Sequence, residues 1–269
     1  SLAAGGSVSI AALFLAGILP GLLLGLTLAI MCLFIAKKQN FPKGRRIPMR
    51  EALAICGDAM WGLMTMVIIL GGILSGVFTA TESAAIAVLW AFFVTMFIYR
   101  DYKWNELPKL AHRTVKTLAI VMILIGFAAS FGYIMTLMQI PQQITSLFTS
   151  VSDNKHVVLL MINVLLLVLG TLMDMAPLIL IMTPILLPVV TAIGVDPVHF
   201  GMIMMVNLGM GLITPPVGGV LFVGAAVAKL PIEAVIKALY PFFGALLVVL
   251  MAVTYVPALS TWLPNLLLK

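Results

Sequence analysis

Main-chain oxygens are the chemistry that the segment 207–218 (NLGMGLITPPVG) offers most plainly. Pro215 and Pro216 have no N–H group, so the pattern predicts that the carbonyls of Gly211 and Leu212 lose their helical partners. Free carbonyls in an apolar setting are costly unless something binds them. Because small hard cations prefer oxygen ligands, the segment predicts a Na⁺ site. A proline kink that serves only packing is the alternative.

The same segment also predicts where the ion and a substrate would bind. The proline after Thr214 biases this residue away from helical geometry, and we expect Na⁺ at Gly211, Leu212 and Thr214. The helix that restarts near Gly218 is expected to offer bare N–H groups and a positive dipole end, which suit a substrate carboxylate. Gly209, Gly211 and Gly218 permit close backbone approach. Such broken helices are typical of transporter binding sites.

A second break lies in the segment 171–183 (TLMDMAPLILIMT). Asp174 is an ionisable residue in an apolar stretch, and such a residue is a functional candidate by default. Asp174 also suits the N-cap of a second helix, with Pro177 in its first turn. Both roles stay open, and they do not exclude each other.

The stretch 157–195 around Asp174 fits either two full spans or a re-entrant helical hairpin, because both return the chain to the side that it left. The turn 171–177 contains no Lys or Arg, whereas every other loop that we expect in the cytoplasm contains at least two. A turn that stops within the protein explains this difference. The hairpin is therefore favoured.

The remaining polar motifs point away from catalysis. Thr79 or Thr81, followed by Glu82, resembles a capping box. This interpretation is favoured over a role for Glu82 as a carboxylate on a transport pathway. The three histidines form no H-E-x-x-H motif, and no nucleotide-binding or nucleophile motif occurs in the required context. We therefore do not expect an enzyme.

Apolar helices must position these residues. The chain has 269 residues, of which 63% are hydrophobic and 9% charged, and its mean hydropathy is +1.22. Soluble domains carry about 25% charged residues, whereas a membrane span needs about 20 apolar residues in helical form. A polar connection, residues 139–155, separates two groups of apolar runs. The runs cover residues 11–36, 52–75, 83–99, 117–138, 157–195, 200–228 and 238–262. The pattern predicts an all-α polytopic membrane protein.

The basic residues predict the orientation of these spans. Of the fifteen Lys and Arg residues, six lie in the loop 37–50, five in the loop 100–116 and two in 229–237. The other two, Lys155 and Lys269, lie on the opposite side if 157–195 returns to the side that it left. The positive-inside rule then places thirteen in the cytoplasm and both ends of the chain outside, in the periplasm of a bacterium.

Several stretches together resemble the large membrane subunit of TRAP (tripartite ATP-independent periplasmic) transporters. Their order agrees with that family, and the resemblance extends across essentially the whole chain. The stretches are SIAALFLAGILPG (9–21), GGILSGVFTATESAAIAV (71–88), GTLMDMAPLILIMTPILLPV (170–189), GVDPVHFG (194–201) and NLGMGLITPPVGGVLF (207–222).

The resemblance implies an elevator-type fold with re-entrant hairpins in inverted repeats, of which this chain holds one half. It implies Na⁺-driven uptake of an organic acid, such as a dicarboxylate, a sugar acid or sialic acid, across the bacterial inner membrane. A periplasmic substrate-binding protein and a small membrane subunit would be its partners, and Na⁺ would couple transport without any other cofactor. Carried over by position, the substrate- and ion-binding residues are Thr171, Asp174, Pro177, Asn207, Gly209, Gly211, Thr214, Pro215, Pro216 and Gly218.

One departure concerns the family's first half, with its own hairpin and Pro-Pro break, which has no counterpart here. We therefore expect a fragment, a split subunit or a truncated product with half of the site. Residues 1–156 are expected to form mainly scaffold and arm helices with cytoplasmic loops 37–50 and 100–116. Residues 157–228 would form the transport-domain hairpin and broken helix, and 229–269 the C-terminal arm and last transmembrane helix. A proton-coupled ion or anion transporter of related elevator type and a non-transporting membrane scaffold stay open as alternatives.

Overall fold

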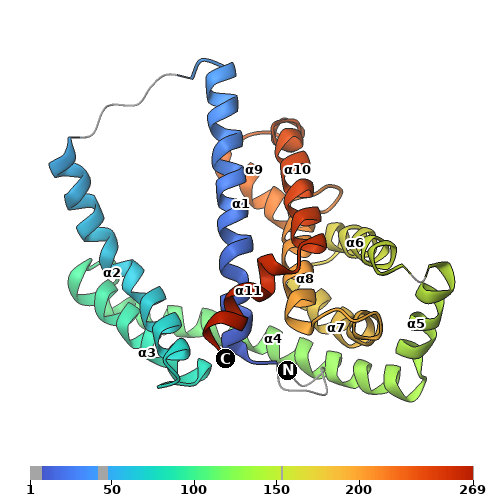
Figure 1. The fold of residues 1–269 in the computed structure, drawn as a ribbon. Helices are drawn as coiled ribbons and strands as arrows, with labels where there is room; N and C mark the ends of the chain where they lie inside the picture. The colour runs from blue at the N-terminus through green and yellow to red at the C-terminus, as the bar shows by residue number, and fades with distance from the viewer. Residues whose placement is uncertain (1–7, 42–47, 153, 269) are drawn as a thin grey trace. The chain divides into compact units, whose positions relative to one another are not determined.

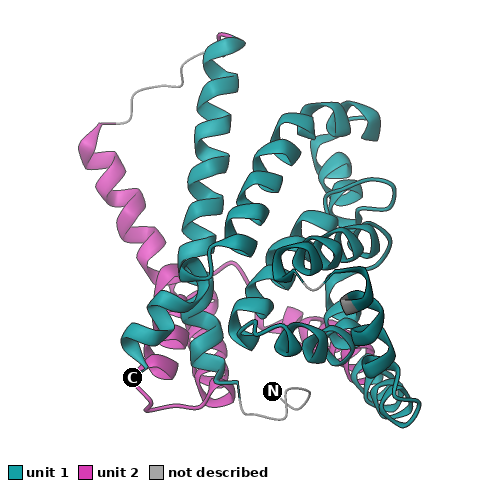
Figure 2. Ribbon diagram, turned by 45° about the vertical axis from the view of Figure 1, so that its right-hand side comes forward, with its two compact units in different colours: residues 1–39, 123–269 teal, residues 40–122 magenta. Residues whose placement is uncertain are grey.

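The computed structural model describes residues 8–41, 48–152 and 154–268. Within these residues all regular secondary structure is helical (Figure 1). The chain divides into two compact units, of which unit 2 is residues 40–122 and unit 1 is the rest (Figure 2). These are packing units, and the division into scaffold and transport domains stays a prediction.

Unit 1 contains most of the helices, including both segments with predicted site residues. They are α1 (Ile10–Lys38), α5 (Ile140–Val151), α6 (Lys155–Leu172), α7 (Met175–Ala192), α8 (Pro197–Gly211), α9 (Gly219–Ala228), α10 (Ile232–Tyr255) and α11 (Ala258–Leu267). Unit 2 contains fewer elements, and its last helix, α4, ends in unit 1. They are α2 (Met49–Leu74), α3 (Ala80–Phe93), a π-helical turn (Val94–Ile98), a 3-10 turn (Trp104–Glu106) and α4 (Leu107–Leu137).

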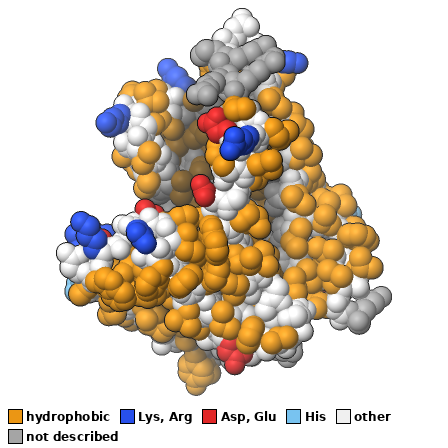
Figure 3. Space-filling view, turned by 90° about the vertical axis from the view of Figure 1, so that its left-hand side faces the viewer, with side chains coloured by type: hydrophobic (Ala, Val, Ile, Leu, Met, Phe, Trp, Pro, Cys, Tyr) orange, Lys and Arg blue, Asp and Glu red, His pale blue; other side chains and the backbone are white. Residues whose placement is uncertain are grey.

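Among the described residues, seven helices are long and apolar enough to cross a membrane: α1, α2, α3 with its π-helical turn, α4 with its 3-10 turn, α6, α7 and α10. Among these described residues, none of those in α2 and α4 is buried. Hydrophobic side chains cover much of the face in Figure 3. Because soluble monomers rarely expose large contiguous apolar patches, this surface suits lipid. The chain is a multi-pass membrane protein, as predicted, while elevator movement and re-entrant insertion stay predictions.

The prediction of a loop over 100–116 is wrong, and the polar segment 139–155 also contains a helix. The loop 100–116 is helical from Leu107 onward, since its Lys and Arg residues are good helix formers and extend α4 beyond the apolar run. The connection 139–155 contains α5, with Pro141 in the first turn, where the missing N–H costs nothing. Phe148 of α5 is buried in the core of unit 1, so tertiary packing stabilises this amphipathic helix.

The last apolar run, predicted as one segment over 238–262, is also broken. Helix α10 ends at Tyr255, and α11 begins at Ala258. The cause is Pro257, which disfavours helical geometry for the residue before it. Val256 accordingly has φ −116° and ψ 84°.

The capping box in unit 2 is confirmed. The Thr79 hydroxyl accepts a hydrogen bond from the Glu82 N–H at 3.3 Å, and the Glu82 carboxylate accepts one from the Thr79 N–H at 2.8 Å. This box starts α3 at Ala80, earlier than the apolar run at 83–99 indicated. Of the two threonines, Thr79 is the cap, and Glu82 has a structural role.

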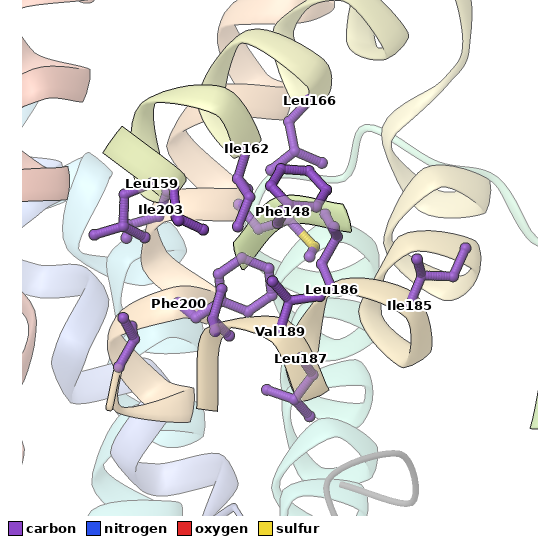
Figure 4. Packing of buried hydrophobic residues seen from close by; sticks show 14 of the residues in the cluster. Phe148, Leu159, Ile162, Leu166, Ile185, Leu186, Leu187, Val189, Phe200 and Ile203 are labelled. Atoms are coloured by element: carbon purple, nitrogen blue, oxygen red, sulfur yellow. The ribbon is translucent and has the colours of Figure 1, made fainter. Parts of the chain in front are cut away.

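Helix α8 lies in the centre of unit 1, packed against α1, α6, α7, α10 and α11. The core around it combines side chains of α5, α6, α7 and α8 itself (Figure 4). Those labelled there are Phe148, Leu159, Ile162, Leu166, Ile185, Leu186, Leu187, Val189, Phe200 and Ile203. This packing holds α6 against α8, and both helices end at the two predicted breaks.

Candidate functional site

The two breaks meet where α6 and α8 end, at a contact between two glycines. A Cβ atom built on Gly211 would lie 2.7 Å from both Cα and C of Gly170 and 2.9 Å from its carbonyl oxygen. These are backbone atoms, which cannot rotate away. No residue with a side chain therefore fits at Gly211 unless the helices separate.

Hydrogen bonds between the two chain segments lie beside this contact. The Thr171 carbonyl oxygen, at the end of α6, accepts from the N–H groups of Val217 at 3.2 Å and Gly218 at 3.4 Å. Carbonyls in the last turn of a helix and N–H groups at the start of another lack partners within their own helices. Here they satisfy each other. We call this contact between residues 170–171 and residues 211–218 the junction.

Glycine is also required where the broken helix restarts. Gly218 precedes α9 and has φ +41°, in the left-handed region that favours glycine. A Cβ atom on Gly218 would lie 3.1 Å from the Thr214 carbonyl oxygen. By contrast, no described atom lies within 4 Å of a Cβ built on Gly209. Close approach of a backbone is therefore confirmed at Gly211 and Gly218, whereas at Gly209 the surrounding space is open and a close approach stays a prediction.

The prediction that the carbonyls of Gly211 and Leu212 lack partners is wrong. The Gly211 oxygen accepts from the Thr214 N–H at 3.0 Å, and the Leu212 oxygen accepts from the Val220 N–H at 3.3 Å. The chain turns tightly after Gly211, so other donors replace the N–H groups that the prolines lack. Each carbonyl has a second lone pair, and the assignment of Na⁺ to Gly211, Leu212 and Thr214 stays a prediction.

Other oxygens of the break are left without donors instead. In a continuous helix, Val217 and Gly218 would donate to the carbonyls of residues 213 and 214. Both donate to Thr171 across the junction, and within the described chain no backbone N–H donates to the carbonyls of residues 213–216. The Thr214 hydroxyl donates to the Met210 carbonyl at 2.7 Å, which leaves its own lone pairs as acceptors. The break therefore presents several oxygens on one short loop.

The expectation of bare N–H groups at the Gly218 helix start is wrong for most of them. Gly218 donates to Thr171, Val220 donates to Leu212 at 3.3 Å, and Leu221 donates to Gly218 at 2.8 Å. The same tight turn that satisfies the carbonyls uses these donors. The segment thus offers more acceptors than donors.

The hairpin tip carries an exposed carboxylate. Asp174 occupies the N-cap position of α7 with extended geometry, but its side chain makes no capping hydrogen bond within the described structure. Pro177 lies half-buried in the first turn of α7. The Thr171 hydroxyl donates to the Val168 carbonyl at 2.7 Å. Asp174 is therefore N-cap by position only, and its functional role, like that of Thr171 and Pro177, stays a prediction.

Sequence reasoning missed a buried polar network that joins α6, α8 and α10. The Asn207 amide donates to the Asn163 side-chain oxygen at 2.8 Å and to the Asn163 carbonyl at 2.9 Å. The Asn163 amide donates to the Thr254 hydroxyl at 2.9 Å, and the His199 Nε2 lies 3.2 Å from the Thr254 carbonyl oxygen. All four side chains are at most 2% exposed. The available signal was the presence of polar residues such as Asn163 and Thr254 inside apolar runs, and it gave no pairing.

Comparison with known proteins shows which protein family this chain matches. The family model described as the DctM component of tripartite ATP-independent periplasmic transporters matches residues 2–259. The chain is 45% identical, over 98% of its length, to the C4-dicarboxylate TRAP transporter large permease protein DctM of Pseudomonas aeruginosa. It is 39% identical, over 97% of its length, to the sialic acid TRAP transporter large permease protein SiaM of Vibrio cholerae. It is 42% identical, over 93% of its length, to the isethionate TRAP transporter permease protein DctMQ of Oleidesulfovibrio alaskensis.

The chain spans part of these relatives, namely 62% of the Pseudomonas protein, 61% of the Vibrio protein and 40% of the Oleidesulfovibrio protein. The match nevertheless covers almost all of the present sequence, including both breaks and the junction that they form. The chain therefore belongs to the DctM family of TRAP transporter large permeases.

Proposed function

We propose that this chain forms part of the large permease subunit of a Na⁺-coupled secondary transporter that takes up an organic acid across the bacterial inner membrane. The observation that carries the proposal is the junction, where two interrupted helical segments meet and the loop 213–216 keeps carbonyl oxygens free of backbone donors. In an apolar environment such oxygens favour a hard cation. The names of the Pseudomonas and Vibrio relatives support an organic acid as substrate.

The surplus of acceptors favours the ion, rather than the carboxylate, as the ligand of this part of the site. Na⁺ would be held by main-chain oxygens of the loop and by the Thr214 hydroxyl, which donates its proton to the Met210 carbonyl and keeps its lone pairs as acceptors. Most N–H groups at the start of α9 are already used. The donors for the substrate carboxylate would therefore come mainly from other parts of the complete permease.

The proposed complex includes a small membrane subunit and a periplasmic substrate-binding protein. The thirteen Lys and Arg residues of the predicted cytoplasmic loops would place both ends of this chain in the periplasm. The hairpin α6–α7 would then enter from the periplasmic side, which is the side on which a binding protein delivers its solute.

The test measures Na⁺ binding by the purified full-length permease with its small subunit. We expect NaCl, compared with choline chloride, to raise the melting temperature of the wild-type complex. Thr214→Val removes one ligand oxygen and is expected to raise the half-saturating Na⁺ concentration about tenfold or more. Thr191→Val is the matched control, because the Thr191 hydroxyl also donates within its own helix, to the Leu187 carbonyl at 2.9 Å, but lies at the far end of α7.

An equal response to Na⁺ and choline in the wild-type complex would remove Na⁺ from the proposal. Uptake of labelled succinate and of sialic acid into proteoliposomes, with the binding protein added, then separates the alternatives. Uptake driven by a proton gradient alone would favour proton coupling. A complex that neither transports a solute nor responds to one would be a scaffold.

A further inference from the structure

The buried amides of Asn163 and Asn207 lie on the same α6–α8 interface as the junction. Asn163 precedes Gly170 by seven residues, and Asn207 precedes Gly211 by four. Both spacings keep two residues on one face of an α-helix. The two helices run towards the junction from this pair. The Asn163–Asn207 contact therefore belongs to the same α6–α8 interface as the contact of Gly170 with Gly211 and precedes it along both helices.

Apolar contacts alone do not fix the register of this interface. Its other buried side chains include Leu159, Ile162 and Leu166 of α6 and Ile203 of α8 (Figure 4). Aliphatic side chains of similar size can replace one another when two helices slide by a turn. Buried amides cannot, because sliding would leave their donors and acceptors unpaired in an apolar interior. A single buried Asn is known to specify register in packed helices in this way.

A third helix restrains the same amide pair. The Asn163 amide donates to the Thr254 hydroxyl of α10, and the neighbouring main-chain carbonyl of Thr254 contacts His199, two turns before Asn207 on α8. Thr254 therefore contacts both helices of the interface. Its two contacts oppose movement of α6 along α8.

We propose that Asn163, Asn207 and Thr254 are positioning residues that set the register of α6 on α8. They thereby hold the Thr171 carbonyl at the N–H groups of Val217 and Gly218. Asn207 acts from the helix interior, where its side chain is fully buried. The consequence for ion binding rests on the proposed function, since the free oxygens of the loop exist only while Thr171 accepts the N–H groups of the break.

The test compares single and double variants of the full-length permease with its small subunit. Asn207→Leu leaves the buried side-chain oxygen of Asn163 without its donor, and Asn163→Leu leaves the Asn207 amide with only the main-chain carbonyl of residue 163, so both are expected to lower the melting temperature. The double variant removes both amides and is expected to regain much of that loss, yet to need about 10- to 100-fold more Na⁺ for half-saturation. Thr254→Val, which nearly preserves shape, is expected to change Na⁺ affinity in the same direction. Ile162→Ala lowers stability on the same interface and is expected to leave Na⁺ affinity unchanged.

The register of α6 on α8 can also be measured without a transport assay. Cysteines at Thr171 and Val217, in a background with the native cysteines replaced, are expected to cross-link rapidly on oxidation, because the main chains of these residues are hydrogen-bonded. The double Leu variant is expected to cross-link severalfold more slowly. A double variant with wild-type Na⁺ affinity and cross-linking would overturn the proposal, and so would an equal Na⁺ effect of Ile162→Ala. If the wild-type complex ignores Na⁺ but the cross-linking rates differ as expected, the proposed coupling fails and the positioning role stands.

Discussion

Gly211→Ala is the substitution that tests the junction most directly. Carbon atoms in contact lie about 3.5–4.0 Å apart, whereas the new Cβ would lie 2.7 Å from two backbone atoms of Gly170. Helices α6 and α8 must therefore separate by about 1 Å, since neither backbone can rotate out of the way. The hydrogen bonds of 3.2 and 3.4 Å from Val217 and Gly218 to Thr171 would stretch beyond hydrogen-bonding range.

The cost combines strain with these lost hydrogen bonds. Overpacking a helix interface costs about 1–3 kcal/mol, and each hydrogen bond contributes about 0.5–1.5 kcal/mol net. The helix propensity of Ala recovers at most about 1 kcal/mol. We expect a net loss of about 3 kcal/mol, which corresponds to a fall of about 5–10 °C in melting temperature.

The assay is thermal unfolding of the full-length complex in detergent, followed by Na⁺ titration of the folded protein. Gly224→Ala is the matched control, because Gly224 also lies in a helix and no described atom lies within 4 Å of a Cβ placed on it. This control is expected to keep the wild-type melting temperature or to raise it slightly. If Gly211→Ala behaved like Gly224→Ala in both measurements, the close contact with Gly170 would not exist in the protein.

Two further predictions concern helix starts. Gly218→Ala places a side chain at φ +41° and is expected to lower the free energy of unfolding by about 1–2 kcal/mol, measured by thermal unfolding. Gly219→Ala is the control and is expected to be neutral, because the space around its Cβ is open. Equal losses in the two variants would contradict the left-handed geometry of Gly218. Thr79→Ala removes the hydroxyl that accepts from the Glu82 N–H and is expected to cost about 1 kcal/mol, measured as a lower melting temperature, while Thr81→Ala, two positions on, is expected to change little.

Local chemistry predicted the positions of the breaks correctly. Pro215 and Pro216 end α8 wherever the rest of the chain lies, because the missing N–H groups are a property of the residues themselves. The capping box at Thr79 likewise needs only Glu82, three residues away. The helix limits failed where a neighbour decides, as at α5, which is held by packing of Phe148 against distant residues.

The partners of the broken helix could not be predicted from the segment itself. Proline chemistry says which N–H groups are missing, but the donors that replace them come from wherever the backbone turns. Val217 and Gly218 find an acceptor 46 and 47 residues earlier in the sequence, at Thr171. The buried network has the same character, since Asn163 and Thr254 are 91 residues apart. A polar residue in an apolar run indicates that it needs a hydrogen-bond partner, but it does not indicate which residue that partner is.

The balance of hydrogen-bond donors and acceptors at the junction follows from this replacement of helical partners by distant ones. A break with two prolines removes two donors from the helix, so the segment begins with more acceptors than donors. Tight turning satisfies Gly211 and Leu212, and Thr171 then takes two of the donors that remain. The segment still has fewer donors than acceptors, so the carbonyl oxygens of residues 213–216 are the ones left without a backbone donor. A positive ion can satisfy these oxygens, whereas an anion would have to compete with Thr171 for the N–H groups that hold the two breaks together.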